Sequence, residues 1–191
     1  SLAHDSLGSP FVLLAGYEPD FAWEAFAETV VGLAEGLQVS SVTWVHAIAM
    51  PVPHTRPIGV TVSGNRAELI AAHSVWRPRT QVPGTAGHLL EHRFVRAERS
   101  VASFVLLIPH YLADTEYPDA VLTAAEKVMA ATGLVLLTDD LREKRVSYLE
   151  RVDEQVRDNE ELGQMVSTLE HRYDAYMAGL DFEDEGPSGF D

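Results

Sequence analysis

The stretch VASFVLLIP (residues 101–109) is the clearest strand in the sequence. It is an almost continuous apolar run, and it ends at a proline, which cannot continue a central strand. A strand covered by helices on both faces shows such a run in place of alternating apolar and polar residues. The stretch therefore predicts a buried strand in a helix-covered sheet.

Strand and helix patterns alternate on both sides of this stretch. We expect strands over residues 11–15, 41–50, 58–62 and 134–137, and helices opening at Pro19 and Asp20 and covering residues 67–73 and 118–132. Residues 74–100 are broken by proline and glycine and fit either a short helix or a hairpin. This order predicts an α/β fold with a mostly parallel sheet flanked by helices.

The pattern changes after Thr138. Two helical stripes follow, and their spacing slips by about one turn at residues 158–161, which indicates two helices and not one. We expect an α/β core over residues 1–138 and an antiparallel helical pair over residues 139–178, packed over the core. Residues 179–191 are acidic and rich in Gly and Pro, which predicts a disordered tail.

Composition excludes several classes of protein. The formal net charge of −15 argues against binding to nucleic acids or anionic membranes, which depends on clustered Lys and Arg. Without cysteine there are no disulfides and no Cys-based zinc sites. No apolar run approaches the roughly 20 residues that cross a bilayer, and we expect no secretory leader because no stretch has the charged-then-apolar pattern. We therefore expect a soluble, cytoplasmic protein.

Polar side chains follow three of the predicted strands. Because ligands bind beyond the carboxyl ends of strands in open parallel sheets, they are candidates for one ligand site: Glu18, His54, Thr55, Arg56, His110 and Tyr111. Such a set suits an anion or a polar metabolite, and it contains residue types able to act as acid and base. The alternative is structural, with these side chains capping carbonyls and helices. No catalytic residue is assigned.

The sequence His88-Leu89-Leu90-Glu91-His92 spells the inverted zinc-peptidase motif HxxEH. On a helix it would place two imidazoles one turn apart, with the glutamate as base. It lies in a stretch broken by Gly and Pro, and in a chain with eight histidines a chance match is not negligible. We interpret it as coincidence and expect no metal and no cofactor, since phosphate-binding glycine loops are also missing.

Several motifs occur in an order that resembles the actinobacterial branch of the proteasome assembly chaperone family: GYEPDFAWEAF (16–26), AMPVPHTRPIGVT (49–61), IPHYLADTEYP (108–118), ATGL (131–134) and LEHRYDAY (169–176). The resemblance implies a core similar to purine nucleoside phosphorylases and related hydrolases, with a C-terminal helical lid over the crevice. Family members carry an EGWNDAG-like turn upstream that this chain lacks, so we expect a first strand to lie outside it.

Two functions stay open. The resemblance implies a non-catalytic assembly or interaction protein that forms homo-oligomers, for example trimers, and binds a protein partner. The alternative is an enzyme or a binding protein for a nucleoside-like or anionic metabolite in the crevice, and an enzyme is the less favoured of the two. Residues 74–100 are a candidate oligomer contact because they mix charges with apolar side chains, namely Val75, Trp76, Leu89, Leu90 and Phe94.

Overall fold

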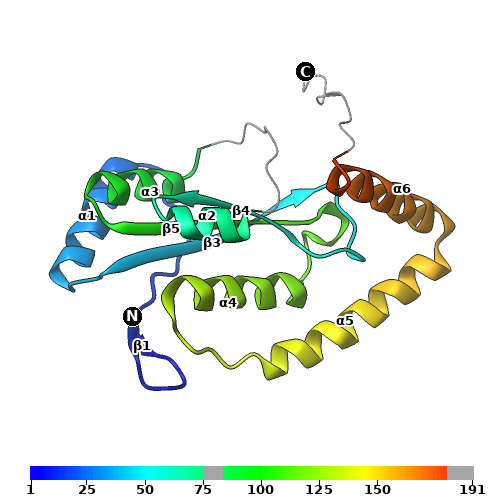
Figure 1. The fold of residues 1–191 in the computed structure, drawn as a ribbon, viewed down its shortest axis with the longest axis horizontal. Coiled ribbons are helices and arrows are strands. Elements are labelled where there is room, and N and C mark those ends of the chain that lie inside the picture. The colour runs from blue at the N-terminus through cyan, green and yellow to red at the C-terminus, as the bar shows by residue number, and fades with distance from the viewer. Residues whose placement is uncertain (75–83, 180–191) are drawn as a thin grey trace.

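The computed structural model describes residues 1–74 and 84–179 and has a three-stranded sheet at its centre (Figure 1). The strand order is β3 (Ser41–Met50), β5 (Ser100–Pro109), β4 (Gly59–Gly64). β3 pairs with β5 in parallel along its whole length, whereas β4 pairs with β5 antiparallel. The α/β class is confirmed.

The prediction of a mostly parallel sheet is wrong, because this sheet is mixed. The reason is the short connection from β3 to β4, residues 51–58. A parallel return needs a crossover of about a dozen residues or more, so a connection this short sends β4 back antiparallel.

β5 is the buried centre of the fold, as its apolar run predicts. Val101, Ala102 and Phe104 have 0% of their surface exposed, and the strand has a neighbour on each side. Its length also sets the length of β3, since the two strands pair from Ser41 with Ser100 to Met50 with Pro109.

Helices cover both faces of this sheet. α3 (Ala86–Arg96) lies on the face of Trp44, because a Cβ added at Gly87 would come within 2.6 Å of that indole ring, and α1 (Trp23–Gly36) packs against α3. The opposite face carries Phe104 and meets α2 (Ala67–His73) and α4 (Pro118–Thr132). The large apolar core lies on this second face.

The first predicted strand is not part of the main sheet. Residues 10–12 form β2 (Pro10–Val12), which pairs antiparallel with β1 (Leu2–His4) in a separate hairpin. The carboxylate of Asp5 accepts hydrogen bonds from the backbone N–H groups of Leu7 (2.9 Å) and Ser9 (2.7 Å) and so shapes the turn. The expected buried strand over residues 11–15 is therefore wrong, and Leu13 and Leu14 are exposed.

Two further boundaries differ from the predictions. α1 begins at Trp23 and not at Pro19, after Ala22 in the left-handed conformation (φ 57°). Residues 134–137 are not a strand, because Val135 bonds to the N-terminal turn. Its N–H donates to Asp5 Oδ2 (2.9 Å), and its carbonyl accepts from the Ser6 N–H (3.0 Å).

The proline- and glycine-broken stretch contains helix α3, whose first turn is capped by the Thr85 hydroxyl. Phe94 is 3% exposed and lies in the core, so it is not available as the oligomer contact that we expected. Leu89 and Leu90 are half-buried. Val75 and Trp76 lie outside the described residues, as does the predicted acidic tail from residue 180 onward.

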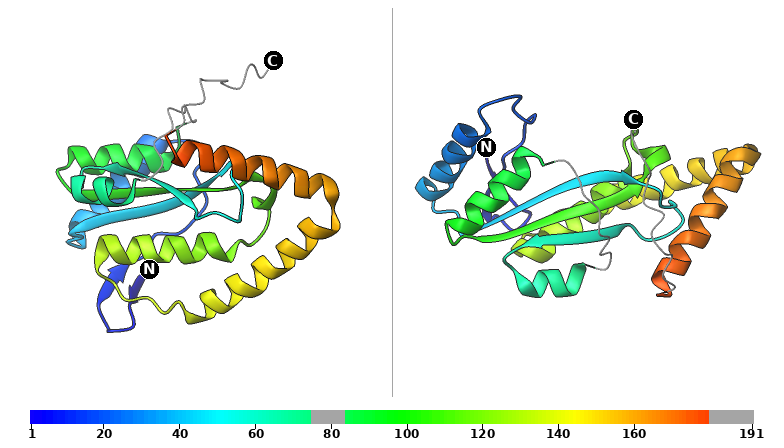
Figure 2. Two further views of the ribbon diagram at one scale, coloured as in Figure 1. Left: turned by 45° about the vertical axis from the view of Figure 1, so that its right-hand side comes forward. Right: turned by 90° about the horizontal axis from the view of Figure 1, so that it is seen from above.

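The C-terminal segment forms two helices, α5 (Asp139–Asp158) and α6 (Glu160–Met177), as the slip in spacing predicts. They meet at Asn159, whose side-chain oxygen accepts from the Leu162 N–H (3.1 Å) and caps α6. α5 leads away from the core and α6 returns toward the sheet (Figures 1 and 2). Within the described residues, no helix is both long and apolar enough to span a membrane.

Two glycines give a matched test of this backbone. Gly64 has φ 115°, and a Cβ there would lie 2.3 Å from the carbonyl oxygen of Val101 on β5. We expect Gly64→Ala to reduce the free energy of unfolding by about 3 kcal/mol, through backbone strain and this clash. Gly32, in the middle of α1 with open space around it, is the control.

Gly32→Ala should raise the free energy of unfolding by about 0.5–1 kcal/mol, because alanine favours the helix. Urea unfolding of both variants measures these changes. Equal stability of Gly64→Ala and wild type would contradict the described end of β4.

Candidate functional site

The candidate site forms where the two parallel strands end. β3 runs into the loop of residues 51–58, and β5 runs into η1 (His110–Leu112), a single 3₁₀ turn. Because Met50 pairs with Pro109, the residues that follow the two strands emerge side by side. This places His54 beside Tyr111, 57 positions apart in the sequence.

His54 is held on both ring nitrogens. It is 5% exposed, its Nδ1 lies 2.6 Å from the Tyr111 hydroxyl, and its Nε2 lies 3.1 Å from Asp153 Oδ1 on α5. The backbone N–H of His54 also donates to the Tyr111 oxygen (2.9 Å). A neutral ring protonated on Nε2 satisfies every contact, since Tyr111 then donates to Nδ1 while Nε2 donates to the carboxylate.

Tyr111 keeps its proton in this arrangement. Burial of the phenol raises its pKa to about 12, and the donated backbone N–H of His54 only partly opposes this effect. The hydroxyl is therefore a donor to His54 over the whole physiological pH range.

Thr55 and Arg56 form their side-chain contacts with α6. The guanidinium of Arg56 donates two hydrogen bonds to Asp174, from Nε to Oδ1 (2.8 Å) and from Nη2 to Oδ2 (2.7 Å). Its Nη1 lies 3.3 Å from Glu170 Oε1. The Thr55 hydroxyl donates to Glu170, and the Tyr173 hydroxyl donates to the Pro57 carbonyl (3.2 Å). The hydrogen bond with Asp174 raises the pKa of Arg56 and lowers the pKa of Asp174.

These contacts form one unit, which we call the latch. It joins the loop to the two C-terminal helices and consists of His54, Thr55, Arg56 and Pro57 on the loop, and Asp153, Glu170, Tyr173 and Asp174 on the helices. The loop predicted to hold a ligand is thus also the docking platform of the helical pair.

The other predicted site residues lie apart from the latch. Glu18 is exposed, and its carboxylate accepts a hydrogen bond from the Ala86 N–H. It therefore caps α3, which lies on the face of the sheet that carries Trp44. Glu18 does not reach the crevice because residues 11–15 are not a strand of this sheet. His110 is exposed, with its ring against the edge of Tyr111 at 5.4 Å between centroids.

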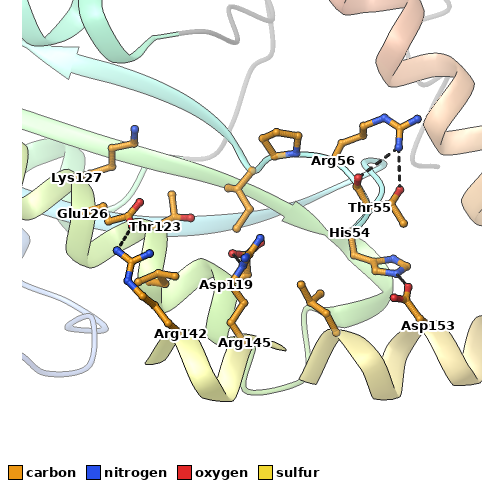
Figure 3. A pocket seen from close by; sticks show the side chains of 14 residues that line it. His54, Thr55, Arg56, Asp119, Thr123, Glu126, Lys127, Arg142, Arg145 and Asp153 are labelled. Atoms are coloured by element: carbon orange, nitrogen blue, oxygen red, sulfur yellow. Dashed lines mark hydrogen bonds and ion pairs between the residues drawn. The ribbon is translucent and has the colours of Figure 1, made fainter. Parts of the chain in front are cut away.

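A pocket of about 700 Å³ opens next to the latch, between the loop, α4 and α5 (Figure 3). His54, Thr55 and Arg56 line one end of it. Sequence reasoning missed the charged side chains that line the rest: Asp119, Glu126 and Lys127 from α4, and Arg142, Arg145 and Asp153 from α5. Helical spacing places each set on one face of its helix, but nothing in the spacing says that the two faces meet.

The charges of the pocket are mostly paired across it. Arg142 Nη2 lies 2.9 Å from Glu126 Oε1, and Arg145 Nε donates to Asp119. Asp119 is 8% exposed, so its pairing with a guanidinium offsets the cost of burying a carboxylate. The pocket offers charged donors and acceptors for a polar molecule, and the latch residues beside it already bond to one another.

The HxxEH residues serve other contacts. His88 shares the first-turn cap of α3 with Thr85, and Glu91 accepts from the Ser63 hydroxyl at 2.9 Å. His92 is exposed. Over residues 1–74 and 84–179, no group of three His, Cys, Asp or Glu side chains is arranged to hold a metal ion.

Solved structures with this fold include several from actinobacteria. A Mycobacterium tuberculosis protein of unknown function is 40% identical, with a TM-score of 0.87 over 93% of this chain and 60% of its own. A Corynebacterium glutamicum protein of unknown function is 29% identical, with a TM-score of 0.88 over 94% of this chain and 67% of its own. The chain thus spans about three fifths of the first relative's length.

A second M. tuberculosis structure, described as a proteasome-assembly chaperone homologue, shares the fold at 22% identity, with a TM-score of 0.73 over 82% of this chain and 66% of its own. No curated protein matches the chain in sequence. The model of the PAC2 family matches residues 2–156, which include the sheet, the latch loop and most of α5. The chain belongs to the PAC2 family.

Proposed function

We propose that this protein is a cytoplasmic, non-catalytic assembly protein that self-associates and binds a protein partner through its C-terminal helices. The observation that carries the proposal is the arm, by which we mean α5 and α6 together (residues 139–177). Its two helices extend beyond the sheet and α4 (Figure 2).

The exposure of the arm is large for its length. In the 20 residues of α5 only Val152 is buried, and in the 18 residues of α6 only Val166 and Leu169 are. Helices with so narrow a buried stripe are not needed in full to complete a core. The remaining faces of the two helices contact either solvent or a partner protein. We propose that they contact a partner.

The latch supports a non-catalytic role. His54 is 5% exposed, and its ring nitrogens and the Tyr111 hydroxyl are used in bonds that reach α5, so these groups serve to dock the arm. The same bonds hold the arm at a defined place on the core, as a rigid binding surface requires.

The relatives suggest the class of partner. One solved M. tuberculosis structure with the same fold is described as a proteasome-assembly chaperone homologue, and this chain belongs to the PAC2 family. By extension, we propose proteasome subunits as the partner and self-association of the chain as part of the mechanism.

The latch is tested by Arg56→Ala. Loss of the two-bond contact with Asp174 should raise amide hydrogen exchange of α6 a few-fold and leave β5 unchanged, because α6 opens locally while the core does not. Arg172→Ala is the matched control, since Arg172 is exposed on the same helix and is not part of the latch. Equal exchange in the two variants would show that the latch does not hold α6.

Acid should loosen the same contact. The folded-state pKa of Asp174 is below its ordinary value of 3.8, mainly through the hydrogen bond from Arg56. Its contribution to stability is therefore complete above that value and is lost as the pH falls through the folded-state pKa. We expect α6 exchange, corrected for its intrinsic pH dependence, to rise below about pH 4. Arg56→Ala should lack much of this rise.

The function itself is tested with purified proteasome α and β subunits from an actinobacterium. The protein should accelerate their conversion into assembled particles several-fold, measured on native gels and by the appearance of peptidase activity. Reversing two exposed charges on the arm, Glu150→Lys with Glu154→Lys, should weaken this effect.

The control reverses two exposed charges outside the arm, Asp20→Lys with Glu28→Lys, and should act like wild type. Sedimentation of the wild-type chain alone reports its self-association. If assembly proceeds at the same rate with and without the protein, and no complex with either subunit forms, the proposal is wrong.

A further inference from the structure

The lining of the pocket beside the latch does not share the strong acidity of the whole chain. It includes four cationic side chains, Arg56, Lys127, Arg142 and Arg145, against three anionic ones, Asp119, Glu126 and Asp153. The chain as a whole has a formal net charge of −15. Because Arg56 is bound to Asp174 and Glu170, the case for an anionic ligand depends on the N–H donors that the other three cations keep.

Three of these cations keep donors for a ligand. Arg142 uses one Nη atom on Glu126, and Arg145 uses its Nε on Asp119, whereas a guanidinium carries five N–H donors. Lys127 has no carboxylate within salt-bridge distance in the described part of the chain. Arg56 differs, because its guanidinium group already forms ion pairs with Asp174 and Glu170.

The three cations come from two elements that meet only in the fold. Arg142 and Arg145 are three residues apart on α5 and lie on one side of that helix, while Lys127 lies on α4 (Figure 3). An anion bound between them would bridge the core to the arm. Both arginines are about half exposed, at 56% and 43%, so a ligand can reach their unused donors while the bonds to Glu126 and Asp119 remain.

The pocket also has an apolar part. Leu122 is 5% exposed, Leu149 packs on the main core, and Ile58 and Pro57 complete this side. Its volume of about 700 Å³ falls within the range of small-molecule sites, about 300–1,000 Å³. Apolar surface beside charged donors fits a ligand with an anionic group on a compact apolar body.

We propose that this pocket binds a small organic anion whose carboxylate or phosphate group contacts Lys127, Arg142 and Arg145, while its apolar part lies on Leu122 and Leu149. This inference goes beyond the assembly function and does not depend on it. Since the ligand touches both α4 and α5, binding stabilises the arm against the core.

Thermal unfolding of the full chain tests the proposal. The probes are phenyl phosphate and benzoate at equal concentration, with inorganic phosphate and neutral benzyl alcohol as comparisons, all at an ionic strength matched with NaCl. We expect at least one organic anion to raise Tm by about 2–4 °C, which corresponds to roughly 1 kcal/mol for a chain of this size. The two anions distinguish a phosphate ligand from a carboxylate ligand.

The variants separate this pocket from the rest of the surface. Arg142→Gln with Arg145→Gln should abolish the shift. Arg151→Gln with Arg157→Gln should retain it, because this pair removes the same charge from the same helix outside the pocket. Lys127→Gln, which breaks no ion pair of a described residue, should weaken the shift and covers the case that the first variant does not fold.

Three results would overturn the proposal. The first is no organic anion raising Tm above the NaCl-matched control. The second is a shift of equal size in the Arg142/Arg145 variant and in wild type. The third is an equal effect of benzyl alcohol, which would mean that the anionic group contributes nothing.

Discussion

The parallel pairing of β3 with β5 is the constraint on which the rest of the structure depends. It runs the full length of both strands and ends with Met50 opposite Pro109. Two chain segments that share no sequence signal therefore leave the sheet at the same point. The contact of His54 with Tyr111, the position of the loop and the docking of the helices all follow from that register.

The latch then converts the strand ends into a platform. His54 is buried with its polar atoms satisfied, and such a network specifies one arrangement, because any other leaves a buried group unpaired. The ion pairs of Arg56 lie nearer to solvent, so they orient α6 on the loop more than they add to the free energy of unfolding. Apolar packing of Val152 and its neighbours on the core supplies the non-directional part of the docking.

The arm and the pocket have a common origin. α5 packs on α4 and leads away from the core, so the two helices present charged faces to each other with space between them. A surface for a partner protein and a pocket for a small anion are thus compatible in one molecule. If both proposals hold, a bound anion would stabilise the arm in the position that a partner meets.

The sequence alone determined those elements whose signal is local. The sequence predicted the apolar strand β5, the limits of α4 and the break between the C-terminal helices, because periodicity and capping act within a few residues. The sequence also identified the family, from motifs that include the loop of residues 51–58. Within the site, the sequence pointed to His54 and Tyr111, since parallel strands end at one edge.

The tertiary structure alone decided what each segment pairs with. Residues 10–12 have the composition of a buried strand, yet they form an outer hairpin, because the Asp5 turn brings them back onto residues 2–4, which pair with them. Glu18 was lost from the site for that reason, while Asp153 and Asp174 entered the latch from helices about a hundred residues downstream of the loop. Pairings over such distances depend on packing and register, and no local pattern records them.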